Sequence, residues 1–357
     1  MLGLITAFFG SFLKTLLIIR YQHLHQHLSH DHDLSSPQKV HKHAVPRIGG
    51  LSILVGLICA LLVLLLQKNS FPNLLFVFLL CAIPTFAIGF VEDLTKKIGV
   101  KLRLVFTAFS AVLITYVLAC PITHLDLPLV DFLFTIPLFG FAFTVFAITG
   151  LANAYNIIDG FNGLASMVAV ITLTTITYVC FKVGDYELTT ISLVMIGSIL
   201  GFFIWNYPRG LIFLGDGGAY LIGFWIAALS ILSVSRHPEI SPWFALIVNA
   251  YPIMETLFTI YRRRIHQNKN PGLPDAIHFH TLIYRRLLTK HPQEEVFLSN
   301  ARTAPYLWVL TGLSAIPAIL WWNQTQMLMI ACAIFIFSYV WIYRQIVRFK
   351  IPGWLRL

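Results

Sequence analysis

The chain has 357 residues, of which 57% are hydrophobic and 11% are charged, and its formal net charge is +10 at pH 7. A soluble globular domain carries about 25% charged residues, so this composition excludes a chain that covers itself with an ordinary water-facing surface. In so apolar a chain the basic excess is typical of membrane topology, and we expect no nucleic-acid partner.

Long apolar runs follow one another along the chain, and a helix needs roughly 20 such residues to cross the hydrocarbon core. The runs lack the alternation of a transmembrane barrel. The first run also lacks the basic start and the cleavage site of a signal peptide, so we expect it to be a retained helix. We predict an all-α, polytopic membrane bundle, with residues 1–357 as a single membrane domain. Its predicted spans, about 11 in number, are 3–19, 48–66, 71–91, 102–120, 132–152, 164–181, 187–205, 211–233, 242–260, 305–322 and 327–343.

Basic residues divide unevenly between the two sets of connecting segments. If the N-terminus lies outside, the inner segments hold 21 of the 25 Lys and Arg residues, and the outer ones hold only Lys68, Lys182 and Arg236. The positive-inside rule therefore predicts an N-out/C-in orientation. The two long inner segments are then a His-rich cytoplasmic loop at 20–47 and a second cytoplasmic loop at 261–304.

Acidic residues at helix ends gather on the predicted inner side. Glu92 and Asp93 follow the third span, Asp159 follows the fifth, and Asp216 precedes the eighth. An Asp at the centre of a transmembrane helix costs about 2.5–3.5 kcal/mol, so the placement of these residues is informative. A lone loop Asp is most often a solvated charge, and Glu92–Asp93 could simply pair with nearby lysines. Three such clusters on one side, each beside glycines and amides, favour a shared site.

Carboxylate and amide oxygens suit Mg²⁺, with Mn²⁺ as an alternative. Helix N-termini favour anions, as do Lys101, Arg103 and the Arg262–Arg264 run. Groups for a metal, groups for phosphate and a membrane location together indicate phosphoryl transfer that involves a lipid. The five histidines of HLHQHLSHDHD at 23–33 could bind a transition metal, but we favour a solvated juxtamembrane segment.

Six motifs carry these residues in order along the chain. They are VHKHAVPRIGG, VEDLTKKIGVK, NAYNIIDGFNGLA, FLGDGGAY, PIMETLFTIYRRR and PDAIHFHTLIYRRLL. In them, over residues 39–290, the chain resembles the polyprenyl-phosphate N-acetylhexosamine-1-phosphate transferases, known as glycosyltransferase family 4. This family includes undecaprenyl-phosphate GlcNAc-1-phosphate transferases and phospho-N-acetylmuramoyl-pentapeptide transferase.

The resemblance implies that a lipid phosphate attacks the β-phosphorus of a UDP-N-acetylhexosamine and that UMP leaves. Asp216 would be the main Mg²⁺ ligand with Asn156 as the second, and Asp93 would orient or deprotonate undecaprenyl phosphate. Asp159 would shape the diphosphate and nucleotide site, and Asn162 would bind the uracil edge. The full set implied is Asp93, Asp159, Asp216 and Glu92 for catalysis, and Lys101, Asn153, Asn156, Asn162, Arg47, His278 and His280 for substrate binding.

The resemblance also implies a multi-pass protein of the bacterial inner membrane with a cytoplasmic active site. It would act first in a cell-surface polysaccharide pathway such as cell wall, lipopolysaccharide or O-antigen synthesis. The 261–304 loop would set substrate specificity, and a homodimer is left open as the oligomeric state.

Four positions depart from the family motifs. Glu92 and Glu255 stand in place of Asp, Asn162 stands where many bacterial members have Asp, and Thr281 replaces the last His of a His-x-His-His stretch. The last change leaves the donor sugar open. A transporter or flippase, with its acids in an ion pathway, is one alternative function, and an inactive lipid-binding relative is another.

Overall fold

A computed structural model describes residues 1–29, 45–67, 72–268, 275, 277–288 and 296–350. Most of the predicted 20–47 loop and parts of the 261–304 loop lie outside the described residues. Within them the chain forms helices and no β-strand, as the composition predicts.

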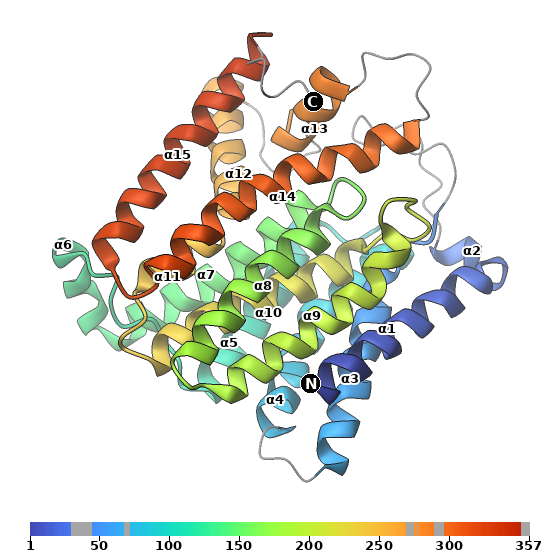
Figure 1. Ribbon diagram of the computed structural model, residues 1–357, viewed down its shortest axis with the longest axis horizontal. Helices are drawn as coiled ribbons and strands as arrows, with labels where there is room; N and C mark the ends of the chain where they lie inside the picture. The colour runs from blue at the N-terminus through green and yellow to red at the C-terminus, as the bar shows by residue number, and fades with distance from the viewer. Residues whose placement is uncertain (30–44, 68–71, 269–274, 276, 289–295, 351–357) are drawn as a thin grey trace.

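The helices are numbered in chain order in Figure 1. They are α1 (Leu2–Arg20), α2 (Gln22–Ser29), α3 (Gly49–Leu66), α4 (Pro72–Thr95), α5 (Val100–Val117), α6 (Pro128–Asp131), the 3₁₀ turn η1 (Phe132–Thr135), α7 (Pro137–Ile158), α8 (Leu164–Lys182), α9 (Tyr186–Asn206), α10 (Gly215–Arg236), α11 (Pro242–Val248), α12 (Ala250–Tyr261), the π-helical turn η2 (Arg262–His266), α13 (Phe279–Ile283), the π-helical turn η3 (Tyr284–Leu288), α14 (Val296–Leu320) and α15 (Thr325–Val347).

Ten helices in the described part of the chain are long and apolar enough to cross a membrane, and a bent pair raises the number to 11. This confirms the predicted all-α membrane bundle of about 11 spans. The fifth span differs from the predicted 132–152. Pro137 takes the first helical turn, which its fixed φ suits, and the helix continues to Ile158. Asn153 and Asn156 are therefore helical residues.

The ninth predicted span, 242–260, is broken. Helices α11 and α12 meet at Asn249 with a bend of 75°. Pro252 explains the break, because its ring would clash with the carbonyl of Val248 four residues earlier and it has no N–H to donate. The freed Val248 carbonyl accepts a hydrogen bond from the Thr172 hydroxyl at 3.2 Å. Neighbouring helices in this way satisfy backbone groups that cannot reach water.

Helix α10 is the central element of the bundle and is buried along almost its whole length. It packs against α3, α4, α5, α7 and α8, while α1 lies on α3 and α9 at the periphery (Figure 1). A helix surrounded by protein on all sides can present polar groups at its end without exposing them to lipid. The residues at the start of α10 are therefore well placed to form a site.

Glycines bring three helices together at the start of α10. A Cβ atom on Gly89 of α4 would lie 2.7 Å from the Cα of Gly217, and one on Gly50 of α3 would collide with the backbone of Gly218. The backbone N–H groups of Gly49 and Gly50 also donate to the carbonyls of Phe213 and Leu214 at 2.9 and 2.8 Å. These glycines thus serve close helix packing, which is common in membrane bundles.

Gly89→Ala should therefore destabilise the protein by about 1–3 kcal/mol, because the added methyl group forces α4 away from α10. Gly150→Ala in α7 is the matched control, since a Cβ atom there would meet no atom within 4 Å. Thermal unfolding in detergent should show a lower midpoint for Gly89→Ala and no loss for Gly150→Ala. Equal midpoints for the two variants would contradict this packing.

Candidate active site

The Asp93 carboxylate, at the end of α4, caps the start of α10. Its two oxygens accept hydrogen bonds from the backbone N–H groups of Asp216 at 2.7 Å and Gly217 at 2.9 Å. The first N–H groups of a helix have no partner within the helix, and their partial positive charge favours an anion. Gly215 has φ +77°, and a Cβ atom on it would lie 2.6 Å from an Asp93 oxygen. Only glycine suits this position.

Asp216 is buried and paired with two arginines. Arg47, from the segment before α3, donates to its Oδ1 atom at 2.6 Å, and Arg103 of α5 pairs with its Oδ2 atom. The Arg47 Nε atom also lies 3.5 Å from Asp93. Two carboxylates and two guanidinium groups from four segments thus meet at one helix end, as buried charges require.

Asn153 and Asn156 of α7 extend this cluster. The Tyr220 hydroxyl, one turn after Asp216, donates to the Asn153 side-chain oxygen at 3.0 Å. Helices α7 and α10 pack together and run in opposite directions, since they are the fifth and the eighth of successive membrane-spanning helices. Asn156 lies one turn further along α7 and is therefore level with the start of α10.

Asp159 begins the loop between α7 and α8 and is half-buried. Burial raises the pKa of its carboxyl group to about 7, and the positive charge of Arg47 opposes this shift. The end of the same loop is anchored firmly: the Gly163 N–H donates to Asn206 at 2.6 Å, and the Trp308 indole donates to the Gly163 carbonyl at 3.2 Å.

His278 and His280 lie beside this loop. Their rings are stacked with centroids 5.2 Å apart, and the His280 ring contacts Phe161 edge to face. A Cβ atom on Gly160 would lie 2.9 Å from the His280 Nε2 atom. Burial, and then the His278 charge, lower the pKa of His280 to about 3, so its ring is neutral at pH 7.

Three residues that the sequence assigned to the site have other surroundings. The Glu92 carboxylate accepts a hydrogen bond from the Ile98 N–H at 2.6 Å in the turn between α4 and α5. Asn162 is buried and donates to the Pro208 carbonyl at 3.2 Å. Lys101 is exposed. Their assigned roles in catalysis, uracil binding and phosphate binding stay predictions.

The sequence did not single out Tyr220 or Tyr339, and it named Arg103 only among the groups that favour anions and not as a site residue. Arg103 lies two residues after Lys101 in a basic stretch, and charge alone does not indicate which of the two turns inward. Tyr220 is one helical turn from Asp216, so the helical period could have found it. Tyr339 lies on α15, and its hydroxyl donates to Glu255 at 2.8 Å.

The raised pKa of Asp159 makes stability depend on pH. Between pH about 4 and 7 the folded protein holds a proton on Asp159 that the unfolded chain has lost, so stability falls as pH rises through this window. Asp159→Asn removes the ionisation. We expect it to unfold at a higher temperature than the unaltered protein at pH 8 and at the same temperature at pH 5, both without divalent cations. If the unfolding temperatures of the two proteins changed in parallel with pH, the raised pKa of Asp159 would be contradicted.

The profile described as glycosyl transferase family 4 matches residues 75–234. The family match covers Asp93, Arg103, Asp159 and Asp216 of this site. The chain is 30% identical over 250 residues to a Bacillus subtilis (strain 168) protein named probable undecaprenyl-phosphate N-acetylglucosaminyl 1-phosphate transferase, which covers 70% of this chain and 68% of that protein.

Two further relatives carry related names. A Thermotoga maritima protein named undecaprenyl-phosphate alpha-N-acetylglucosaminyl 1-phosphate transferase is 27% identical, over 71% of this chain and 73% of its own. A Lactobacillus helveticus protein named phospho-N-acetylmuramoyl-pentapeptide-transferase is 25% identical, over 68% of this chain and 76% of its own.

Proposed function

The chain belongs to glycosyl transferase family 4, and from this membership we propose that it transfers a sugar-1-phosphate from a UDP-N-acetylhexosamine to undecaprenyl phosphate, releasing UMP. The names of the B. subtilis and T. maritima relatives specify undecaprenyl phosphate as acceptor and an N-acetylglucosaminyl 1-phosphate as the transferred group. The observation that carries the proposal is the pairing of Asp93, Asp216, Arg47 and Arg103 at the start of the buried helix α10.

In the proposed reaction an oxygen of the lipid phosphate forms a bond to the β-phosphorus of the donor. The bond between that phosphorus and the oxygen of UMP breaks, and UMP leaves with the electron pair. Phosphoryl transfer of this kind depends mostly on positioning and on neutralisation of negative charge. Arg47, Arg103 and the N–H groups at the start of α10 would provide that neutralisation.

The oxygen-rich ligand set fits Mg²⁺. Each oxygen of Asp216 accepts one arginine contact and retains a lone pair, and the Asn156 amide lies level with it on α7. No group of three or more His, Cys, Asp or Glu residues in the described ranges could hold a metal ion alone. Such a partial set suits Mg²⁺, which usually takes several ligands from substrate phosphates and water. When bound, the ion would polarise the diphosphate.

Asp93 would act by position. Both of its oxygens accept backbone N–H groups of α10, so it fixes the helix that carries Asp216. Lipid phosphate is already an anion near neutral pH, and the attack does not require a strong base. Asp159 and the two histidines would then border the diphosphate and the sugar.

The active site would face the cytoplasm of a bacterial inner membrane. The charge distribution supports this orientation, since the helix ends that carry Asp93, Asp159 and Asp216 join the basic segments. A second polar cluster of Asp185, Glu187, Arg236 and His237 lies in other connecting segments, those predicted to face outward.

The test is a panel of UDP-sugars. Detergent-purified protein, undecaprenyl phosphate and each donor are incubated with Mg²⁺ or with a chelator, and UMP is measured. We expect release with at least one N-acetylated donor, with loss of release in chelator. Absence of UMP with every donor, from protein that is folded by its unfolding transition, would contradict the proposed function.

A further inference from the structure

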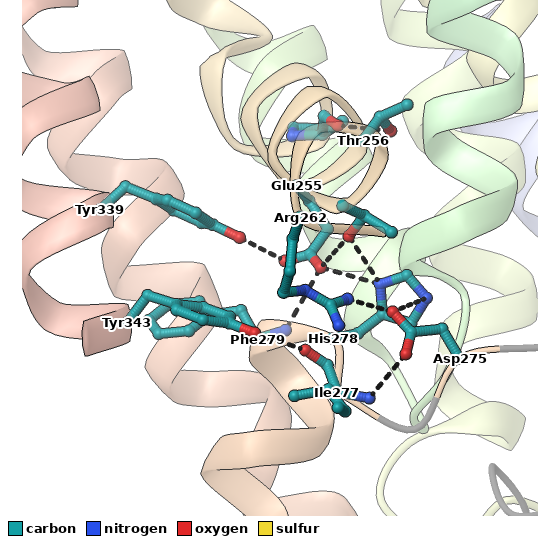
Figure 2. Close-up of polar contacts among 11 residues, drawn as sticks. Glu255, Thr256, Arg262, Asp275, Ile277, His278, Phe279, Tyr339 and Tyr343 are labelled. Carbon is teal, nitrogen blue, oxygen red and sulfur yellow. Dashed lines mark hydrogen bonds and ion pairs between the residues drawn. The ribbon is translucent and has the colours of Figure 1, made fainter. Parts of the chain in front are cut away.

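A buried carboxylate in α12 holds the segment that carries His278 and His280. Glu255 is 1% exposed, and its Oε1 atom accepts hydrogen bonds from the His278 Nδ1 atom at 2.9 Å and from the Phe279 N–H at 3.2 Å. Its Oε2 atom accepts the Tyr339 hydroxyl at 2.8 Å. Figure 2 shows these contacts converging on Glu255 from the segment that carries His278 and Phe279 and from α15. A buried carboxylate is stable only with such partners.

The contacts fix the orientation of the His278 ring. A carboxylate only accepts hydrogen bonds, so the His278 Nδ1 atom must carry the proton that it donates. Its Nε2 atom then faces Asp275, 3.9 Å away. Asp275 is itself paired with Arg262, which follows directly after α12. The segment is thus tied to α12 through Glu255 and to the residue that follows α12 through Arg262.

The His278 ring links Glu255 to the loop that contains Asp159. Its ring stacks on His280 at an interplanar angle of 15°, and His280 contacts Gly160 in the loop next to Asp159. The His280 Nδ1 atom is buried and has no hydrogen-bond partner among the residues that the structure describes. An unpaired buried donor or acceptor costs about 1–3 kcal/mol, so this atom is available for a ligand that enters beside the loop.

The last helix of the bundle braces the same segment. Tyr339 binds Glu255, and one turn later the Tyr343 hydroxyl donates to the Ile277 carbonyl at 3.1 Å (Figure 2). Helix α15 packs against α11, α12, α13 and α14. It lies beyond the 75–234 stretch that the family profile matches. Its tyrosines therefore connect the end of the chain to the residues beside the active site.

We propose that Glu255, with the Tyr339 hydroxyl, is a positioning residue that holds His278 and His280 against the Asp159 loop for binding of the UDP-sugar donor. The inference rests on the proposed function. A change at Glu255 should weaken use of the donor more than use of the lipid, because the network touches the Gly160 side of the site and not the Asp93–Asp216 cluster.

The test uses Glu255→Gln and Tyr339→Phe, with Tyr155→Phe as the matched control. Tyr155 is also fully buried, and its hydroxyl contacts only Thr172 among the described hydrogen bonds, at 3.3 Å. Glu255→Gln should raise the donor KM about tenfold and leave the lipid KM unchanged, since hydrogen bonds to a charged group are lost. Tyr339→Phe should raise the donor KM several-fold, and Tyr155→Phe should not. A donor KM that does not rise in Glu255→Gln, or an equal rise for both substrates, would overturn the inference.

Hydrogen exchange separates this inference from the proposed function. In the protein without substrates, peptides that span 277–283 should lose protection in Glu255→Gln and in Tyr339→Phe, but not in Tyr155→Phe. Unchanged protection in the first two variants would refute the positioning role whatever the enzyme's activity. Failure of the unaltered protein to release UMP would instead refute the proposed function.

Discussion

Asp216→Asn should lower the rate of UMP release by roughly 10³-fold, the loss typical of removing one group that stabilises charge in a transition state. Asparagine keeps an oxygen for one arginine but loses the negative charge that pairs with both Arg47 and Arg103 and would hold Mg²⁺. The arginines remain to attract the donor diphosphate. We therefore expect kcat to fall much more than the donor KM rises, and the Mg²⁺ concentration for half-maximal rate to increase.

Asp126→Asn is the matched control for this prediction. Asp126 lies in a loop away from the cluster, where its carboxylate accepts a hydrogen bond from the Thr325 hydroxyl. Its φ of +57° is one that asparagine adopts readily. This variant should keep the unaltered rate. If Asp216→Asn kept it too, Asp216 would not be the metal ligand.

Asp93→Ala should cost both activity and stability. Alanine leaves the N–H groups of Asp216 and Gly217 buried without their acceptor, and it removes the carboxylate beside Arg47. Removal of one partner of a buried charge pair costs about 3–5 kcal/mol. We expect a marked fall in the unfolding midpoint in detergent, together with loss of UMP release. Asp93→Asn keeps one acceptor, so its unfolding midpoint should lie between those of the unaltered protein and Asp93→Ala.

A second helix cap provides the comparison. Asp185 accepts a hydrogen bond from the Leu188 N–H at 2.9 Å at the start of α9, and its second oxygen lies 3.4 Å from Arg236 and 3.0 Å from His237. Loss of an ordinary cap costs about 1 kcal/mol and loss of a partly exposed ion pair about 0–1 kcal/mol, so Asp185→Ala should destabilise the protein less than Asp93→Ala. An Asp93→Ala protein with an unchanged midpoint and no activity would show that Asp93 acts in the chemistry and not by holding α10.

Local properties of the sequence predicted most of the fold. A membrane-spanning helix depends on the hydropathy of about 20 consecutive residues, and the apolar runs match the observed helices. The bend at Asn249 went unpredicted although Pro252 marks it, because the run 242–260 is predominantly apolar. The fifth span was placed too early in the chain, since hydropathy does not detect that Pro137 begins the helix.

The site was predictable where its residues belong to recognisable motifs and much less so where packing selects them. Asp93 and Asp216 were assigned to one site from their motifs, and the Asp216 N–H donates a hydrogen bond directly to the Asp93 carboxylate. Which of Lys101 and Arg103 reaches Asp216 depends on how α5 packs against α10. The link from Tyr339 to Glu255 joins residues 84 positions apart. No local pattern contains such a contact.

The most direct measurement follows the β-phosphate of the donor. A UDP-N-acetylhexosamine with a radiolabel on that phosphate is incubated with the purified protein and undecaprenyl phosphate, and the nucleotide and lipid products are separated. Transfer of a sugar-1-phosphate predicts that the label moves to the lipid and that unlabelled UMP forms in equal amount. Label that leaves as UDP, or a lipid that gains no label from any active donor, would contradict the proposed reaction.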